Sequence, residues 1–406
     1  NGAADIDFFQ MSLKDLVQLE VETGSLINKG TKHSVSAITV IHYEQIQQSP
    51  ARTLSLLLEQ YVPGLIVMAH SQGDKIGMRG NIAAENYKML LLVNGKNVTN
   101  MVYEGAITEI DQWDLNDIEK VEVIRGPGSV TYGTGAIAGV INIITKNSTS
   151  NLSEFTVGVR HNPTFNSSGL NLQYSKRYDN VDVYGYASIN STDGFEDPDY
   201  YNMATDSGTD IRFVGKKPTD SLGPQPYLAD TRDRPQVKAH LNFDFGEDLS
   251  TWLRYTQSGK THYFSTEKQL SYLDANGNQI VRKGTYNSGV LTRSFIASTD
   301  YKNKLSENTS IKTSVTFDTQ EYLRQTLSNT SFVEESPANL KDYAFSQNRL
   351  VATALYQYNT DDLNLTVGYE FNNNYVTSPW FESSDHLWIR EGLHIINDVN
   401  KSVYTQ

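Results

Sequence analysis

The stretch DIEKVEVIRGPGSVTYGTGAIAGVINIITK, from Asp117 to Lys146, decides the fold of this chain. Its β-branched and apolar residues predict one strand over 121–125 and a second strand over 140–145. Glycine recurs between the two strands, so the backbone there adopts conformations that side chains forbid, or it lies directly against another part of the chain. These glycines are Gly126, Gly128, Gly133, Gly135 and Gly139.

A nucleotide-binding loop is the first hypothesis to test, because Gly133, Gly135 and Gly139 loosely imitate the glycine spacing of a dinucleotide site. In such a site the glycines open a helix whose N-terminus receives the pyrophosphate. Here Gly139 leads directly into VINIIT, a β-branched run that predicts a strand. The context therefore excludes a nucleotide loop.

The same stretch closely resembles the end of the plug domain of TonB-dependent outer-membrane receptors, where the run E-x-I-R-G-P-x-S-x-x-Y-G-x-x-A-x-x-G-x-I-N-I-x-T-K recurs. A glycine-rich β-hairpin without such a role is the alternative. The resemblance implies a plug domain. The residues that match the run are Glu122, Ile124, Arg125, Gly126, Pro127, Ser129, Tyr132, Gly133, Ala136, Gly139, Ile141, Asn142, Ile143, Thr145 and Lys146.

Earlier parts of the chain resemble the same domain. A strand is predicted over 35–41, and a helix over 52–61 stops at Pro63-Gly64. Three further sequence motifs of the family are matched. Leu57, Leu58, Pro63 and Gly64 match L-L-x-x-x-P-G, and Arg79 and Gly80 match R-G. Met89 to Val98 resembles the strand and turn V-L-V-D-G, with Asn94 in place of the aspartate.

The resemblance divides the chain into a periplasmic lead-in over 1–34, a plug domain over 35–147 and the first part of an outer-membrane β-barrel over 148–406. The lead-in contains a helical pattern that begins with a capping box at Ser12 and Asp15. In the family, a short extended segment near the N-terminus couples the receptor to its energy source. Asp5 to Phe9 is one candidate for that segment.

The composition excludes several other classes of protein. The chain has 406 residues and a formal net charge of −13, and a nucleic-acid partner needs a basic patch, so none is expected. Cysteine is absent, which excludes zinc fingers, thiol nucleophiles and disulfide frameworks. The sequence has no run of about 18 apolar residues, so no membrane-spanning helix is predicted. No signal peptide is visible at Asn1, so we expect either a mature form or a cytoplasmic chain.

After Asn147 the sequence alternates between apolar and polar residues with a period of two, which helices cannot show. Between 237 and 245, for example, Lys238, His240 and Asn242 separate apolar residues. The alternation predicts strands with one apolar and one polar face. The predicted strands lie over 154–160, 170–174, 181–189, 237–245, 249–255, 291–301, 311–317, 350–358 and 363–371.

A soluble β-sandwich would show the same alternation. Three features favour a membrane barrel instead. Strands of about ten residues fit a tilted span, aromatic residues gather at strand ends, and short turns alternate with long polar connections. The turns lie at 178–180 and 246–248, and the long connections at 192–233 and 259–290. We therefore predict an α+β plug domain followed by antiparallel transmembrane β-barrel strands. The aromatic residues at strand ends are Tyr255, Tyr301, Tyr356, Tyr358 and Phe371.

The predicted strands fill only part of such a barrel. Plugged transporter barrels have about 22 strands, which need on the order of 500 residues. A half barrel would leave two strand edges without hydrogen-bond partners in lipid. We expect the remaining strands to come from missing sequence or from another chain.

By resemblance, Arg79 and Arg125 lock the plug, because in the family these two positions pair with acidic residues of the barrel wall. A buried arginine needs such a partner. The alternative is an ordinary pair within the plug, such as Arg125 with Glu122. The family's barrel-wall acids usually lie late in the barrel, so we expect them beyond residue 406. The motif glycines are Gly80, Gly126, Gly133 and Gly139.

By resemblance, the loops 68–76 and 98–108 face the outside, where a few convergent polar groups bind a ligand. A solvated loop tip is the alternative for each residue. One histidine without a partner at ligand spacing predicts no metal site, and the acidic loop 194–210 matches no calcium spacing. No catalytic motif is present, so neither a cofactor nor an enzyme activity is expected. The ligand-binding candidates are His70, Gln72, Tyr103 and Glu104.

The resemblance implies a receptor in a bacterial outer membrane that binds a scarce extracellular ligand. It imports the ligand when a periplasmic TonB-type energy-coupling protein pulls the plug. An iron–siderophore complex is the default small ligand, with cobalamin, haem and glycans open. Two alternatives remain: a plugged barrel reused as a structural, adhesive or surface-receptor component without transport, and a soluble β-rich enzyme with an α+β appendage.

Overall fold

The computed structural model describes most of the chain after the lead-in, and its described residues fall into two compact units. The first unit covers Asn1–Met68, Lys75–Ala106 and Leu115–Lys146, and the second covers Ala69–Asp74, Ile107–Asp114 and Asn147–Gln406. The described ranges are 37–51, 53–68, 74–82, 86–100, 105–126, 135–148, 155–163, 167–192, 211–212, 235–262, 265–266, 268–273, 279–284, 286–328, 343–360, 363–377 and 397–405.

A five-stranded sheet in the order β1-β6-β7-β4-β5 forms the centre of the first unit. Strands β4 and β7 run parallel and the other neighbours run antiparallel. Strands β2 and β3 form a separate hairpin. Among the described residues, no helix is long and apolar enough to cross a membrane. The elements are β1 (Ala37–His42), α2 (Tyr43–Gln48), α3 (Leu54–Tyr61), β2 (Leu65–Met68), β3 (Lys75–Met78), β4 (Met89–Val93), β5 (Lys96–Asn97), β6 (Ile118–Arg125) and β7 (Gly139–Thr145).

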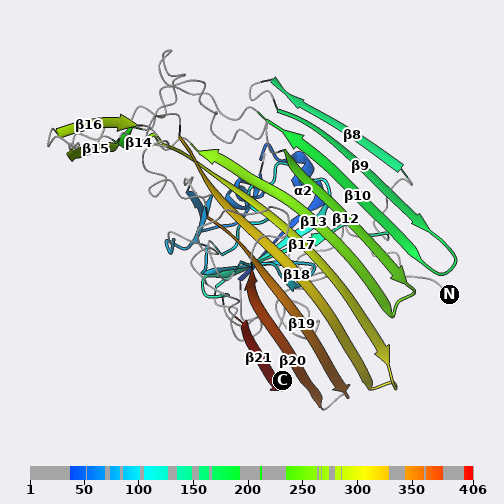
Figure 1. The fold of residues 1–406 in the computed structure, drawn as a ribbon. Coiled ribbons are helices and arrows are strands. Elements are labelled where there is room, and N and C mark those ends of the chain that lie inside the picture. The colour runs from blue at the N-terminus through cyan, green and yellow to red at the C-terminus, as the bar shows by residue number, and fades with distance from the viewer. Residues whose placement is uncertain are drawn as a thin grey trace. The chain divides into compact units, whose positions relative to one another are not determined.

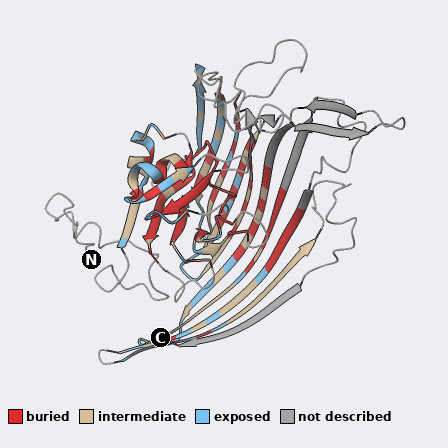
Figure 2. Ribbon diagram, turned by 90° about the vertical axis from the view of Figure 1, so that its left-hand side faces the viewer, coloured by how far each residue is buried: buried red, intermediate tan, exposed pale blue. Residues whose placement is uncertain are grey.

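The two strands predicted in the opening motif form β6 and β7, which lie next to each other in this sheet. Every residue of β7 is buried, and Figure 2 shows most of the described sheet of the first unit in red. The first residue of β7 is Gly139. Any side chain at this position would place its Cβ 2.7 Å from the carbonyl oxygen of Ile124. The motif thus needs glycine at this position to let β6 and β7 pair.

The predicted turn at Asn94 is a two-residue hairpin loop between β4 and β5. Asn94 and Gly95 have φ angles of 48° and 74°, the left-handed conformation that such loops favour in Asn-Gly pairs. The Asn94 amide donates to Thr145 Oγ1 at 2.9 Å, and its oxygen accepts from the Thr145 backbone N–H at 2.9 Å. The turn residue therefore also fastens β7.

A ten-stranded sheet forms the bulk of the second unit, and Figure 1 shows its strands side by side. Each strand pairs antiparallel with its neighbour in the sheet, and the sheet order follows the chain order from β8 to β21. Two short strand pairs, β11–β14 and β15–β16, lie outside it. The strands of the large sheet are β8 (Phe155–Asn162), β9 (Ser167–Arg177), β10 (Asp182–Ser191), β12 (Gln236–Phe245), β13 (Leu249–His262), β17 (Tyr286–Lys304), β18 (Thr309–Ser328), β19 (Tyr343–Asn359), β20 (Asn364–Thr377) and β21 (Asn397–Thr405). The short strands are β11 (Ile211–Arg212), β14 (Ser265–Thr266), β15 (Lys268–Leu273) and β16 (Gln279–Gly284).

Every run of alternation that predicted a strand lies in this sheet, but the strands are longer than predicted. Strands β17 and β18 have 19 and 20 residues. The predicted connection 259–290 is partly wrong, because β13 continues to His262 and β17 already begins at Tyr286. Backbone pairing continues there through stretches that are polar at nearly every position, so the sequence no longer alternates. Strand β21 was not predicted, because its sequence is also too polar to alternate.

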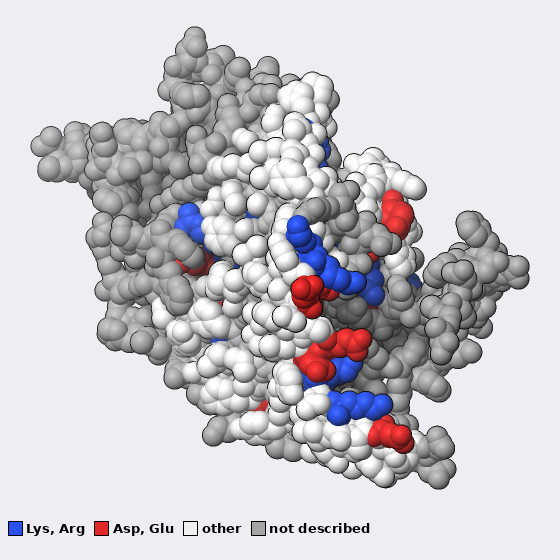
Figure 3. All heavy atoms as spheres, turned by 90° about the vertical axis from the view of Figure 1, so that its right-hand side faces the viewer, with Lys and Arg blue, Asp and Glu red and all other residues white. Residues whose placement is uncertain are grey.

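The two faces of the large sheet differ in polarity. One face exposes large apolar side chains; Val315, for instance, is 54 % exposed. A soluble protein rarely exposes so wide an apolar face, whereas a membrane barrel presents one to lipid. In Figure 3 the described surface is mostly uncharged, and its basic and acidic groups lie next to one another. Exposed residues of the apolar face include Leu170, Leu172, Ile189, Leu241, Phe245, Tyr301, Val315, Leu350, Tyr356, Leu365, Val367 and Tyr369.

The other face is polar and largely buried. Its side chains include Lys238, His240, Arg254, Asp318 and Arg349, each almost fully buried. Asp318 and Arg349, on the neighbouring strands β18 and β19, form an ion pair at 2.7 Å. Charged groups at this depth need partners, and the partners of the cations on β12 and β13 lie in a distant part of the sequence.

Candidate functional site

Residues 107–114, ITEIDQWD, interrupt the first unit and belong to the second. We call them the wall segment, because they lie on the polar face of strands β10, β12 and β13. All eight residues are buried. The segment folds as two short turns, closed by the N–H of Ile110 on the carbonyl of Ile107 and by the N–H of Gln112 on the carbonyl of Glu109, both at 3.3 Å.

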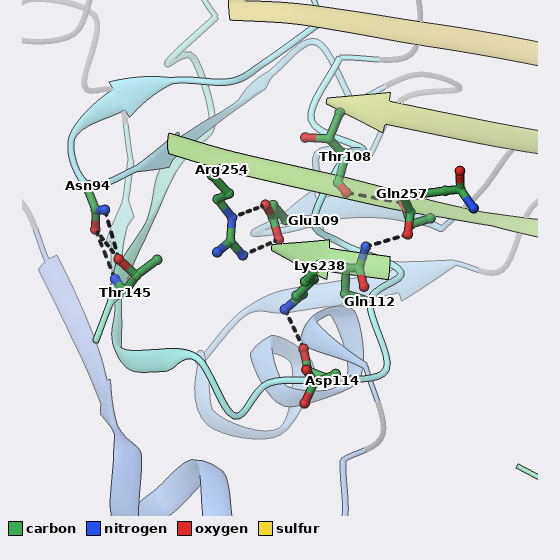
Figure 4. Close-up of polar contacts among 10 residues, drawn as sticks. Asn94, Thr108, Glu109, Gln112, Asp114, Thr145, Lys238, Arg254 and Gln257 are labelled. Atoms are coloured by element: carbon green, nitrogen blue, oxygen red, sulfur yellow. Dashed lines mark hydrogen bonds and ion pairs between the residues drawn. The ribbon is translucent and has the colours of Figure 1, made fainter. Parts of the chain in front are cut away.

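A buried ion pair joins Glu109 of the wall segment to Arg254 of β13. Arg254 Nε donates to Glu109 Oε1 at 2.8 Å, and Arg254 Nη2 donates to Glu109 Oε2 at 3.0 Å. The two side chains are 4 % and 1 % exposed, and Figure 4 shows the guanidinium and the carboxylate facing each other. A two-point pair of this kind fixes orientation as well as distance.

Asp114, at the other end of the wall segment, is held by β10 and β12. The Tyr186 hydroxyl donates to the Asp114 carboxylate, and Lys238 Nζ donates to the Asp114 backbone carbonyl. Figure 4 shows Lys238 pointing at Asp114. Both ends of the wall segment are therefore fastened to the strands by charged side chains.

The backbone of the wall segment is also bound by strand side chains. Gln236 bridges it twice: its Oε1 accepts from the Trp113 N–H at 2.9 Å and its Nε2 donates to the Asp111 carbonyl at 2.8 Å. Arg160 of β8 donates to the Trp113 carbonyl at 2.8 Å. Ser258 of β13 donates to the Thr108 carbonyl at 3.2 Å.

In one further contact a wall-segment side chain binds the strand backbone. Gln112 Nε2 donates to the carbonyl of Gln257 at 3.0 Å, as Figure 4 shows.

Charges on the two sides of this contact are complementary. The wall segment carries acidic residues and the strands carry basic ones, and all of them lie at the contact. This arrangement binds one part of the chain to another. In the described ranges, no group of three or more His, Cys, Asp and Glu residues is placed to hold a metal ion. The acids are Glu109, Asp111 and Asp114, and the bases are Arg160, Lys238 and Arg254.

The chain enters the wall segment through Gly105. Its φ is 70°, and a Cβ there would lie 2.4 Å from the backbone carbon of Asn86. Asn86 in turn donates to the Ala106 carbonyl at 3.0 Å and accepts from the Ile76 N–H at 2.8 Å. The first unit therefore holds the backbone firmly up to the residue where the wall segment begins.

The predicted locking residues Arg79 and Arg125 lie in the first unit. Arg79 has a φ of 53°, and its N–H donates to the Gly64 carbonyl at 2.6 Å. A Cβ at Gly126 would lie 4.0 Å from Arg79 Nη1, so the Arg79 guanidinium reaches the backbone next to Arg125. Arg125 Nε is buried, with no hydrogen-bond partner among the described residues.

The predicted motif glycines have several structural roles. Gly80 and Gly126 have φ angles of 78° and 147°, and Gly139 allows β6 and β7 to pair. Gly133 lies outside the described residues, and so do all four ligand-binding candidates, His70, Gln72, Tyr103 and Glu104.

The residues that fasten the wall segment were not predicted. The alternation over 237–245 and 249–255 does put Lys238 and Arg254 on the polar face, but it does not reveal what they meet. A signal was present in the acidic run EIDQWD of residues 109–114, whose charge complements these bases. Pairing them requires knowing that two segments more than a hundred residues apart lie together.

Comparison with known sequences places the plug pattern in a family. The sequence model described as "TonB-dependent Receptor Plug Domain" matches residues 31–140. The vitamin B12 transporter BtuB of Vibrio vulnificus is 33% identical over 133 residues, which is 32% of this chain and 21% of that protein. The iron-regulated outer membrane virulence protein of Vibrio cholerae is 37% identical over 121 residues, which is 28% of this chain and 18% of that protein. The ferric enterobactin receptor PirA of Pseudomonas aeruginosa is 32% identical over 161 residues, which is 34% of this chain and 21% of that protein.

Solved structures extend the similarity to the strand sheet. A mutant of the ferric enterobactin receptor of Pseudomonas aeruginosa matches with a TM-score of 0.53 at 18% identity, over 84% of this chain and 49% of that chain. A second mutant of the same receptor, in complex with enterobactin, matches with a TM-score of 0.52 at 18% identity, over 84% and 50%. At this identity the likeness shows the fold alone. The chain spans about half the length of these structures and each sequence match covers about a fifth of the relative.

Proposed function

Because the chain belongs to the TonB-dependent receptors, we propose that it forms the plug and the first part of the barrel of a transporter that imports a scarce ligand by energy-coupled rearrangement of the plug. Its place is the bacterial outer membrane, and its relatives are transporters and receptors rather than enzymes.

One observation carries the proposal. A segment from within the matched plug sequence binds the polar face of strands whose opposite face is apolar and exposed. A plug that seals a lipid-facing sheet needs such contacts, because buried cations on the polar face must be paired. The Glu109–Arg254 pair meets that need.

We propose an iron–siderophore complex as the ligand. Support comes from relatives named as ferric enterobactin receptors. Vitamin B12 is the competing ligand class, because relatives named as its transporters are similarly identical. Ferric enterobactin is therefore the first probe and vitamin B12 the comparison.

The proposal assigns residues 1–34 to coupling with a periplasmic TonB-type protein, 35–147 to the plug and 148–406 to the barrel. Arg79 and Arg125 are proposed to bind acidic residues of the barrel wall. Such a residue would supply the partner that Arg125 Nε lacks among the described residues. His70, Gln72, Tyr103 and Glu104 are proposed to contact the ligand.

Completion of the barrel is part of the proposal. Strands β8 and β21 end the large sheet, and each has a strand partner on one side only among the described residues. Open edges are not viable in lipid. We propose that further strands, from the rest of a longer protein or from another chain, pair with both.

Deletion of residues 1–30 tests the function. Cells that express the whole protein with this deletion should bind ferric enterobactin at their surface but no longer accumulate it, because the pull cannot reach the plug. Unchanged accumulation would refute the coupling mechanism. A peptide of residues 1–30 should also retain the periplasmic coupling protein on a column, and a scrambled peptide should not.

A further inference from the structure

We propose that Asn94 and Gly95 form a modification site, at which Asn94 deamidates to aspartate or isoaspartate, and that Asn142 and Thr145 of β7 hold this site unreactive in the folded protein. Asparagine is a chemically labile residue, and a following glycine makes it more so because no side chain shields the glycine nitrogen. Gly95 is exposed and Asn94 is partly exposed, so water reaches the turn. The site lies within the first unit and is independent of ligand and transport.

The reaction needs two groups of the turn and one water molecule. The backbone nitrogen of Gly95 attacks Cγ of Asn94 and forms a C–N bond. The Asn94 side-chain nitrogen leaves as ammonia, with the proton that the Gly95 nitrogen gives up. The resulting five-membered succinimide then reacts with water. Addition of water at Cγ gives aspartate, and addition at the backbone carbonyl carbon gives isoaspartate, whose main chain runs through Cγ.

The first argument is that the attacking nitrogen is already engaged. The Gly95 N–H donates to Asn142 Oδ1 at 3.0 Å, and Asn142 is 2% exposed in the middle of β7. The nitrogen can attack only after it has left this oxygen. A buried acceptor that loses its donor costs stability, so the unreactive arrangement is favoured.

The second argument is that the amide under attack is held at both ends. Asn94 Nδ2 donates to Thr145 Oγ1, and Asn94 Oδ1 accepts from the Thr145 backbone N–H, both at 2.9 Å. Because a backbone N–H can only donate, this contact fixes which end of the amide is oxygen. Both bonds break when the side chain turns to bring Cγ to the Gly95 nitrogen.

The third argument is that β7 supplies both protecting residues. Strands β4 and β7 pair in parallel, with Leu92 opposite Asn142, so the turn that follows β4 lies beside this part of β7. Figure 4 shows the Asn94 amide facing Thr145. Protection therefore depends on the pairing of β4 with β7, and it should be lost when the sheet comes apart.

The two products differ in their effect on the fold. Aspartate at position 94 keeps an oxygen for the Thr145 N–H and loses only the bond from Nδ2. Isoaspartate adds a carbon to the main chain between β4 and β5. Because the length of a hairpin loop fixes the register of its strands, isoaspartate would displace the turn and release β7 from it.

Mass spectrometry of the whole protein after incubation in detergent at neutral pH tests the site. Trypsin cleaves after Lys88 and Lys96, so one short peptide, 89–96, reports on Asn94. Asn276–Gly277 is another Asn-Gly pair of the chain, and it supplies the reference rate in guanidinium chloride. We expect the two pairs to react at similar rates in the denaturant. In the folded protein, Asn94 should react severalfold more slowly than in the denaturant.

Variants of β7 test the protection. Thr145→Val removes the acceptor of Asn94 Nδ2, and Asn142→Leu removes the acceptor of the Gly95 N–H. Each should raise the rate at Asn94 severalfold in the folded protein and leave the rate in guanidinium chloride unchanged. Thr145→Ser is the matched control, because it keeps the hydroxyl and should keep the slow rate.

Two results would overturn the proposal. Equal rates at Asn94 in the folded and the denatured wild-type protein would show that β7 gives no protection. Equal rates in folded Thr145→Val and Thr145→Ser would show that the Thr145 hydroxyl has no part in it. Thermal denaturation identifies a variant that does not fold, and the comparison of folded with denatured wild-type protein then decides.

Discussion

Arg254 and Glu109 are 145 positions apart in the sequence, yet their buried side chains meet through two hydrogen bonds of 2.8 and 3.0 Å. The pair is the chemical junction between the plug sequence and the strand sheet. Its energetics follow from burial, because each charge depends on the other for the interactions it has given up with water.

Breaking this pair from one side should be costly. Glu109→Leu and Arg254→Met should each lower the free energy of unfolding by about 3–5 kcal/mol. The double variant Glu109→Leu/Arg254→Met should cost less than either single change, because no buried charge is left over. Equilibrium unfolding of the protein in detergent measures both. Additive losses would show that the two residues do not interact.

The Tyr186 hydroxyl contributes through its bond to the Asp114 carboxylate. Tyr186→Phe should destabilise the protein by about 1.5–3 kcal/mol, the range for a hydrogen bond to a charged group. Tyr184→Phe is the matched control, since Tyr184 lies two residues away on the same buried face and bonds to Gln173 Oε1 only at 3.4 Å. If thermal denaturation showed equal losses for the two variants, the Asp114 contact would have no special role.

Gly105 should tolerate no side chain. A Cβ would lie 2.4 Å from the Asn86 backbone, which is fixed in the first unit. We expect Gly105→Ala to lower the yield of folded protein sharply. Gly95→Ala is the control, because Gly95 has a similar φ of 74° but nothing within 4 Å of the added carbon. It should cost only about 1–2 kcal/mol, the price of a left-handed residue. Equal yields would contradict the clash.

A charge on the apolar face should impair insertion. Val315 is 54 % exposed on that face, and an arginine at the middle of a lipid-facing band costs about 2–4 kcal/mol. Val315→Arg should reduce folding into lipid vesicles, measured by resistance to heat-induced mobility shift. Glu307→Arg, in the exposed turn between β17 and β18, should not. Normal folding of Val315→Arg would mean that Val315 does not face lipid.

Much of the fold could be predicted because its elements are determined by residues that are close together in the sequence. The motif around Arg125 and Gly139, the helix that ends near Tyr61 and the Asn94 turn each depend on neighbouring residues. The strands were visible wherever one face is apolar and the other polar. Strand β21 was not visible, because the sequence NDVNKSVYT has too few apolar residues to alternate.

The site could be predicted only in outline. Period-two alternation tells that Lys238 and Arg254 share the polar face, and the acidic run 109–114 shows an excess of negative charge. What joins them is a contact between distant segments, which no local pattern records. For the same reason the resemblance pointed to Arg79 and Arg125, whose partners remain a proposal, while the fastening of the wall segment was missed.

The unbroken chain order of the large sheet bears on how the protein is built. Since the strands of the large sheet follow one another in chain order, with only the short strands β11 and β14 to β16 left outside it, the sheet can grow one strand at a time from β8 onward. Glu109 and Asp114 are synthesised before any of those strands. When β12 and β13 are added, the Asp114 carbonyl that Lys238 binds and the Glu109 carboxylate that Arg254 binds are already present in the chain.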